Sequence, residues 1–148
     1  TLANRGTVYN LTLLDKLTDS SGNLVVQYTP DIANKTSFSS ANWDTIQAGM
    51  EAVGKHYVTA KNLSGNVEIA GKTGTAEENK LRPNHANFIG YAPYSNPQIS
   101  VTVTIPYGYT SGNSMSVAND IFDYYFGFKT LDSILAGSAA KAGLVIDD

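Results

Sequence analysis

The sequence predicts an α+β fold in which helices cover an antiparallel β-sheet. Three strand patterns, joined by short loops, lie between two amphipathic helical patterns. Short loops indicate antiparallel neighbours, because parallel strands need a longer crossover. Hydrophobic residues make up 42% and charged residues 16% of the 148 residues, which is typical of a globular domain with its own core.

The first part of the chain predicts the end of a helix followed by a hairpin. Residues 1–6 have the pattern of a last helical turn, with Gly6 as its C-terminal cap. Because the chain starts there without a methionine, we interpret it as a piece of a longer protein. Residues 7–28 predict two strands around the turn cluster at 19–23, and Pro30 is expected to end the second strand.

The central helix is predicted over residues 39–54. Ser39 or Ser40 is expected to cap it, and Gly54 is expected to end it. Ile46, Met50 and Val53 recur at helical spacing, which predicts one buried face.

The strands and the second helix follow. The third strand alternates apolar with polar residues, as a half-buried strand does. Asn113 or Ser114 is expected to begin the second helix, and Gly127 is expected to end it. Residues 1–128 are interpreted as one incomplete domain, and residues 129–148 as a tail or linker. The three strands are predicted at 67–77, 87–92 and 99–105.

Composition excludes several classes of function. The chain has no cysteine, which excludes disulfides, thiolate metal sites and cysteine catalysis. A net charge of −3 without a basic patch argues against nucleic-acid binding. His56 and His85 have no metal-ligand spacing, so no metal site is expected. No apolar run is long enough to predict a membrane span.

The segment Lys72-Thr73-Gly74-Thr75 carries the chemistry. In a strand, Lys72 and Gly74 share one face, while Thr73 and Thr75 share the other. Glycine inside a strand often marks the close approach of a ligand. A cation, two hydroxyls and an accessible backbone predict an anion site, although a surface strand with a solvated lysine has the same pattern.

The context of this segment distinguishes the two interpretations. The run from Ile69 to Glu77, followed by the second run from Ala86 to Pro93 and then a Val/Ile/Thr strand, resembles the transpeptidase domain of the penicillin-binding proteins. The resemblance extends over residues 1–128 and is closest to the C-terminal part of the domain in the monofunctional, class B members.

The resemblance implies a serine D,D-transpeptidase that cross-links peptidoglycan stem peptides ending in D-Ala-D-Ala and is acylated by β-lactams. It implies catalytic roles for Lys72 and Thr75. It also implies that Thr73, Gly74 and Thr75 bind the substrate, with no metal or cofactor. The longer protein would act at the extracytoplasmic face of the bacterial membrane, although this chain holds no anchor.

The family has three motifs, which are Ser-x-x-Lys, Ser-x-Asn and Lys-Thr-Gly. The first two are not recognisable in this chain at the positions that the family gives them. Ser138-Ala139-Ala140-Lys141 matches Ser-x-x-Lys but follows the lysine strand instead of preceding it. Ser40-Ala41-Asn42 and three Ser-Gly-Asn segments match Ser-x-Asn, and we interpret them as a helix cap and turns. The chain alone is therefore expected to be inactive and to need the missing portion of the domain. The alternatives are a non-catalytic interaction or structural fragment and part of a penicillin sensor.

Overall fold

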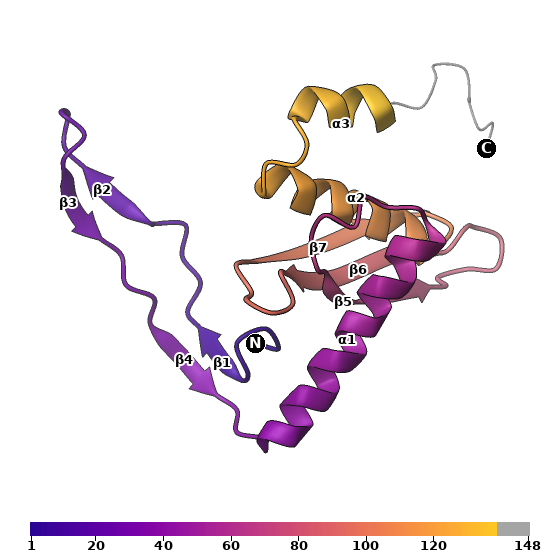
Figure 1. The fold of residues 1–148 in the computed structure, drawn as a ribbon, viewed down its shortest axis with the longest axis horizontal. Helices are drawn as coiled ribbons and strands as arrows, with labels where there is room; N and C mark the ends of the chain where they lie inside the picture. The colour runs from indigo at the N-terminus through magenta and orange to yellow at the C-terminus, as the bar shows by residue number, and fades with distance from the viewer. Residues whose placement is uncertain (139–148) are drawn as a thin grey trace. The chain divides into compact units, whose positions relative to one another are not determined.

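The computed structural model describes residues 1–138 and divides the chain into two compact units. The first unit comprises Thr1–Ile46, and the second begins at Gln47. The boundary falls inside the helix α1, which spans Ser40–Ala60. Each unit is described by itself (Figure 1).

The first unit holds the predicted hairpin, which is longer than expected. The strand β2 (Lys16–Thr18) pairs with β3 (Leu24–Gln27) around the turn, and β1 (Thr7–Tyr9) pairs with β4 (Ile32–Lys35). Pro30 lies in the break after the return strand β3, as predicted, and a separate strand begins two residues later. Before the hairpin, Gly6 has a φ of 101°, and its N–H donates to the carbonyl of Thr1, as expected of a cap.

The turn at the tip of the hairpin depends on Asp19. Its carboxylate accepts the backbone N–H of Ser21 at 2.9 Å and that of Asn23 at 2.8 Å. Hydrogen bonds lower the pKa of Asp19, and the bond with the side chain of Asn23 has the largest effect. Turn formation in this segment thus follows from side-chain hydrogen bonds that compete with the strand ladder.

Helix α1 begins where the sequence predicted but extends past Gly54 to Ala60. The hydroxyl of Ser39 accepts the N–H of Asn42 at 3.3 Å, which caps the first turn. At Gly54 a Cβ atom would lie 1.8 Å from the carbonyl oxygen of Ile69. The glycine therefore permits close approach between the helix and the following strand segment, instead of ending the helix.

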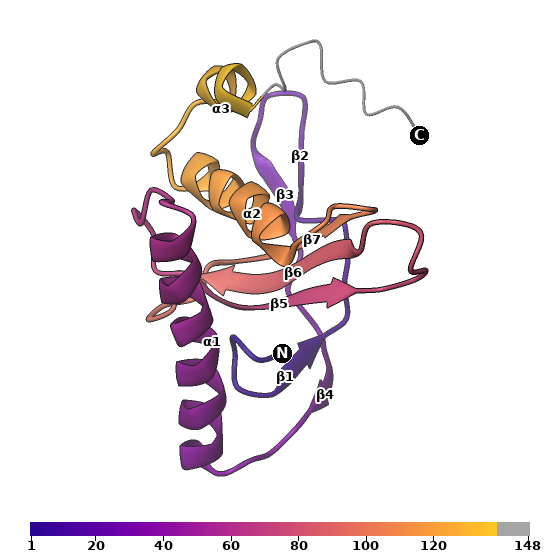
Figure 2. The same ribbon diagram turned by 90° about the vertical axis from the view of Figure 1, so that its right-hand side faces the viewer.

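The three predicted strands form an antiparallel sheet with the order β5-β6-β7, which confirms the meander. β5 spans Ala70–Ala76, β6 spans His85–Ala92 and β7 spans Ile99–Ile105. Helix α2 lies across one face of this sheet in both views (Figure 2). The buried core between them confirms the predicted α+β arrangement; it includes Phe88, Val103, Met115, Ala118 and Phe122.

Helix α2 spans Ser111–Tyr125 and starts earlier than predicted. Thr110 is the N-cap, and its hydroxyl accepts the N–H of Gly112 at 3.1 Å. Ser111-Gly112-Asn113 therefore forms the first helical turn, and our interpretation of it as a turn between elements was wrong. Gly127 follows the helix with a φ of 77°, as predicted for a C-terminal glycine.

A third helix, α3 (Leu131–Ser138), occupies part of the segment that we interpreted as a tail or linker. Ser133 donates its hydroxyl to the carbonyl of Thr130 at 2.7 Å, and Thr130 accepts the N–H of Ser133 through its own hydroxyl. This N-terminal cap is a helix signal that was not recognised in the sequence. Residues 139–148 lie outside the described part of the chain, and the domain limit at residue 128 stays a prediction.

Candidate functional site

The segment Lys72–Thr75 lies in β5, at one edge of the sheet. In the antiparallel register, Lys72 faces Ile89, Thr73 faces Phe88 and Thr75 faces Ala86. Phe88 is buried under α2, whereas Ile89 is 57% exposed. Cross-strand partners share a face, so Thr73 lies on the helix-covered face and Lys72 on the opposite, open face. The alternation expected from the sequence is present.

Lys72 is an exposed cation at this edge. Its Nζ donates to the carbonyl oxygen of the next residue, Thr73, at 2.6 Å. The side chain thus folds back over its own strand and stays accessible. An accessible cation next to an unpaired strand edge is an arrangement that can bind an anionic group and the backbone attached to it.

Gly71 and Gly74 of this strand lie in different surroundings. A Cβ atom at Gly71 would lie 2.5 Å from the ring of Phe88, and one at the cross-strand partner Gly90 would lie 2.4 Å from the same ring. These glycines make room for Phe88. At Gly74 the nearest atom would be Cβ of Asn87 at 3.6 Å, which is ordinary contact. The fold therefore does not require Gly74, and the space above it remains available to a ligand.

On the helix-covered side of the sheet, the phenol of Tyr57 in α1 contacts the first turn of α2. The phenol of Tyr57 lies 3.0 Å from Oγ of Ser111 in the first turn of α2. Hydrogen bonds with Ser111 and then Thr73, together with the nearby charges of Lys72 and Lys61, lower the pKa of Tyr57. Tyr57 was not predicted, because Gly54 was expected to end the helix before it. Continuing the spacing of Met50 and Val53 by one turn would have found it.

A second polar cluster lies beyond the carboxyl end of β5. Tyr107 donates its hydroxyl to Glu78 at 3.2 Å and accepts a hydrogen bond from Arg82 at 2.8 Å. Its N–H donates to Nδ1 of His85 at 3.2 Å, and the two rings lie 5.0 Å apart. Tyr107 has a φ of 54°, an uncommon conformation for a non-glycine residue. These contacts join the β5–β6 loop to the segment after β7.

The serines that match catalytic motifs serve other purposes where the structure describes them. Ser40 is the first residue of α1. Ser64 donates its hydroxyl to Asp123 at 2.9 Å, and Ser111 contacts Tyr57. Ser138 is the last residue of α3, while Lys141 lies outside the described residues.

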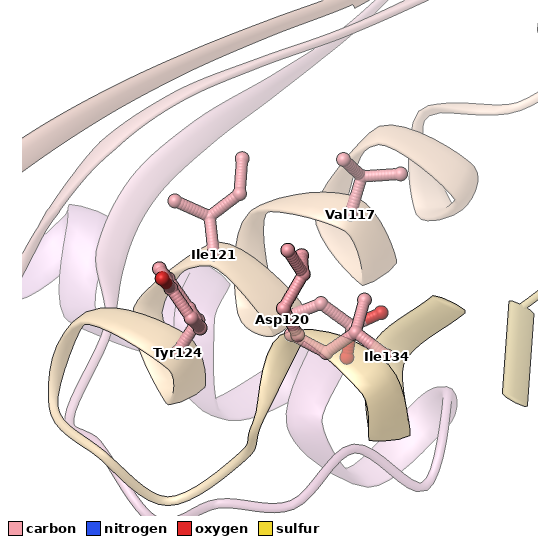
Figure 3. Close-up of a pocket in the computed structure, with 6 residues that line it drawn as sticks. Val117, Asp120, Ile121, Tyr124 and Ile134 are labelled. Atoms are coloured by element: carbon pink, nitrogen blue, oxygen red, sulfur yellow. The ribbon is translucent and has the colours of Figure 1, made fainter. Parts of the chain in front are cut away.

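An apolar pocket of about 240 Å³ lies between α2 and α3 and takes in none of the predicted site residues (Figure 3). Its one charged lining residue, Asp120, bonds Lys129 at 2.7 Å. The pocket is lined by Val117, Asp120, Ile121, Tyr124, Leu131 and Ile134. Within residues 1–138, no helix combines the length and hydropathy needed to cross a membrane.

Residues 1–125 match the family described as the penicillin binding protein transpeptidase domain. Penicillin-binding protein 2B of Streptococcus pneumoniae is 34% identical over 114 residues, which cover 70% of this chain and 17% of that protein. Penicillin-binding protein 2A of Bacillus subtilis is 29% identical over 150 residues, which cover 88% of this chain and 21% of that protein. The chain thus spans about a fifth of the length of these relatives.

Solved structures show the same fold. The D,D-transpeptidase domain of a peptidoglycan glycosyltransferase from Eggerthella lenta superposes with a TM-score of 0.68 at 24% identity, covering 88% of this chain and 30% of that chain. PBP2 of Pseudomonas aeruginosa, solved in complex with WCK 5153, superposes with a TM-score of 0.62 at 32% identity, covering 84% of this chain and 28% of that chain. The chain therefore belongs to the penicillin-binding protein transpeptidase domain family.

Proposed function

We propose that this chain forms the sheet half of a serine D,D-transpeptidase site that cross-links peptidoglycan stem peptides and is acylated by β-lactams. The observation that carries the proposal is the edge strand Lys72–Thr75, where the exposed Lys72 lies beside Gly74, a glycine that the fold itself does not need. A peptide carboxylate and its backbone match such a strand edge, since the edge offers N–H and C=O groups.

Each residue of the strand has a proposed role. Lys72 supplies positive charge next to the serine machinery, and Gly74 lets the ligand lie against the strand. Thr73 and Thr75 bind the carboxylate, and the N–H of Thr75 serves as an oxyanion donor, worth about 100-fold in rate or more.

The nucleophile has to come from outside the described sheet. An acyl-enzyme requires an activated serine, and the sequence holds its single Ser-x-x-Lys match at Ser138, after the lysine strand. We propose that the portion with Ser-x-x-Lys and Ser-x-Asn belongs to the longer protein and packs against the open face of the sheet, beside the exposed Ile89. The longer protein acts outside the cytoplasmic membrane, and this chain alone is inactive.

The relatives support binding of β-lactams at this site. Penicillin-binding protein A of Mycobacterium tuberculosis was solved as an imipenem acyl-enzyme complex, and its fold superposes on 84% of this chain with a TM-score of 0.69. A relative from Haemophilus influenzae, 35% identical over 107 residues, is named a peptidoglycan D,D-transpeptidase. We extend both properties to the longer protein by homology.

The test is covalent labelling with a fluorescent penicillin, read by denaturing gel and intact mass. The complete open reading frame that encodes this chain is expected to be labelled on a serine outside residues 1–148, and the 148-residue chain alone is expected to stay unlabelled. Labelling of the chain itself would direct attention to Ser138. An unlabelled complete protein would refute the transpeptidase proposal and favour a non-catalytic fragment.

A further inference from the structure

Three strand ends lie side by side where the lysine strand stops. His85 begins β6 and pairs with Ala76, the last residue of β5. Its neighbour Ala86 pairs with Ile105, the last residue of β7. The β5–β6 loop, residues 77–84, and the segment that follows β7 therefore both leave the sheet beside His85.

Tyr107, in the segment after β7, is bonded to this junction through both its backbone and its side chain. Its N–H donates to Nδ1 of His85 at 3.2 Å, and its hydroxyl donates to Glu78 at 3.2 Å. The guanidinium carbon of Arg82 lies 5.4 Å from the centre of its ring. A tyrosine keeps a φ of 54° only where its surroundings hold it there. These contacts thus maintain a conformation that Tyr107 would otherwise leave.

The two ring nitrogens of His85 have different partners. Because Nδ1 accepts the N–H of Tyr107, the proton of the neutral ring lies on Nε2. Nε2 is 3.4 Å from the carboxylate of Glu78. The titratable and charged groups that the described residues place around His85 are this carboxylate, the phenol of Tyr107 and, bonded to that phenol, the guanidinium of Arg82. Ala76, the partner of His85 on β5, has no charge.

We infer that the bond between Tyr107 and His85 is a pH-sensitive switch: a second proton on His85 removes the acceptor of the Tyr107 N–H and loosens residues 106–110 at the end of the lysine strand. Two N–H groups then face each other across 3.2 Å. Histidine is the side chain that ordinarily changes charge between about pH 5 and 8.

The direction of the switch follows from the two contacts of His85. The protonated ring gains an ion pair with Glu78, but the side chain of Glu78 is 55% exposed, and exposed pairs contribute little. The loss of the acceptor of Tyr107 therefore outweighs this gain. The N–H of Tyr109 still donates to the carbonyl of Asn84 at 3.0 Å, so the segment stays attached and the change is local.

The effect of the switch on the site rests on the proposed function. His85 pairs with the residue that follows Thr75, so a loosened strand end displaces groups that the reaction needs in place. We expect the penicillin acylation constant of the complete open reading frame to be several-fold lower than that of His85→Asn in acid and equal to it at alkaline pH. The ratio of the two proteins cancels the pH dependence of the chemistry itself.

Hydrogen exchange of the complete open reading frame tests the switch without catalysis. Asn at position 85 offers an oxygen near the place of Nδ1 but takes up no proton. Peptides that cover residues 106–110 should exchange alike in the wild type and His85→Asn at about pH 8, and roughly 5- to 10-fold faster in the wild type at about pH 5, the effect of one lost hydrogen bond. His56→Asn, which changes the other histidine of the 148 residues, is the matched control and should behave as the wild type.

His85→Ala removes the acceptor at every pH, so its residues 106–110 should exchange fast in both conditions. Unchanged exchange of β6 and α2 shows that each variant remains folded. A ratio of wild type to His85→Asn that is the same in acid and in alkali, or full protection in His85→Ala, would overturn the switch. If exchange responds but the acylation ratio does not, the switch does not regulate the site. An unlabelled wild type would refute the proposed function, while the exchange result still decides the switch.

Discussion

Gly71 and Gly74 lie three residues apart on one strand and differ in what surrounds them. Gly71→Ala would force a methyl group against the Phe88 ring, and we expect a loss of about 1–3 kcal/mol in the free energy of unfolding. Gly74→Ala meets only ordinary contact and should leave stability within about 0.5 kcal/mol.

Chemical denaturation of the chain measures the two stabilities, and penicillin acylation of the complete protein measures ligand binding. We expect Gly74→Ala to slow acylation while it folds normally. Equal losses of stability at both positions would show that Gly74 is a packing residue and not a ligand contact.

Lys72 is the residue whose charge the proposed chemistry needs most. In the complete protein, Lys72→Met is expected to slow penicillin acylation by about 100-fold, comparable to the loss of one preorganised electrostatic contact in an active site. The control is Lys80→Met, which removes an exposed lysine from the β5–β6 loop. Similar rates for wild type and Lys72→Met would favour the solvated surface lysine that the sequence pattern also allowed.

At the scale of elements, the buried carboxylate of Asp123 in α2 binds the turn that follows α1. Asp123 is 1% exposed and accepts from Ser64 at 2.9 Å and from Asn119 at 3.1 Å. Asp123→Ala leaves these donors without their acceptor, and we expect a loss of roughly 3 kcal/mol in the free energy of unfolding. Asp132→Ala, on the exposed first turn of α3, is the control and should change stability by less than about 0.5 kcal/mol. A small effect at Asp123 would contradict the network.

Lys129 adds a pH-dependent contact to the same network. Its hydrogen bond with Asp120, and more weakly that with Asp123, raises the pKa of Lys129 above the ordinary 10.5. A raised pKa in the folded state means that the ion pair stabilises fully below the unfolded value and that this contribution disappears as pH rises through the folded value.

The wild type should therefore lose thermal stability relative to Lys129→Met only as the pH rises above 10.5, while the difference between the two proteins stays constant at neutral pH. Thermal unfolding measured in parallel across that range provides the check. A difference that already changes near pH 7 would assign the effect to another group.

At the scale of the whole molecule, the two units differ in how much they bury. Every residue of β2 and β3 is exposed, and so are Leu11 and Leu13 in the segment between β1 and β2. A two-stranded hairpin without a covered face is marginally stable. In contrast, β6 and α2 supply most of the buried core of the second unit.

Hydrogen exchange should reveal this difference. Amides of β6 and α2 are expected to be protected most strongly, and those of β2 and β3 to exchange fastest among the paired strands. The measurement is peptide-level exchange followed by mass spectrometry on the 148-residue chain. Equal protection of β2 and β6 would mean that an additional contact covers the hairpin.

The sequence alone predicts the three-stranded meander, the lysine strand with its alternating faces, and the family to which the chain belongs. Alternation and turn chemistry are local signals, so a one-dimensional pattern is sufficient to predict them. The length of α1, the start of α2 and the presence of α3 were not predicted correctly. Gly54 in α1 and the pair Ser111-Gly112 in α2 are residues that usually interrupt or end a helix, and tertiary contacts override this tendency.

Only the tertiary structure decides which residues pack together behind the edge strand. Gly54 looks like a helix end until the carbonyl of Ile69 is placed against it. Tyr57 looks like a core aromatic until Ser111, more than fifty residues away in the sequence, is brought to 3.0 Å from its phenol. Hydrogen bonds and close approaches between distant segments have no local periodicity. The edge strand can therefore be predicted from the sequence, whereas the contacts between distant segments exist only once the chain has folded.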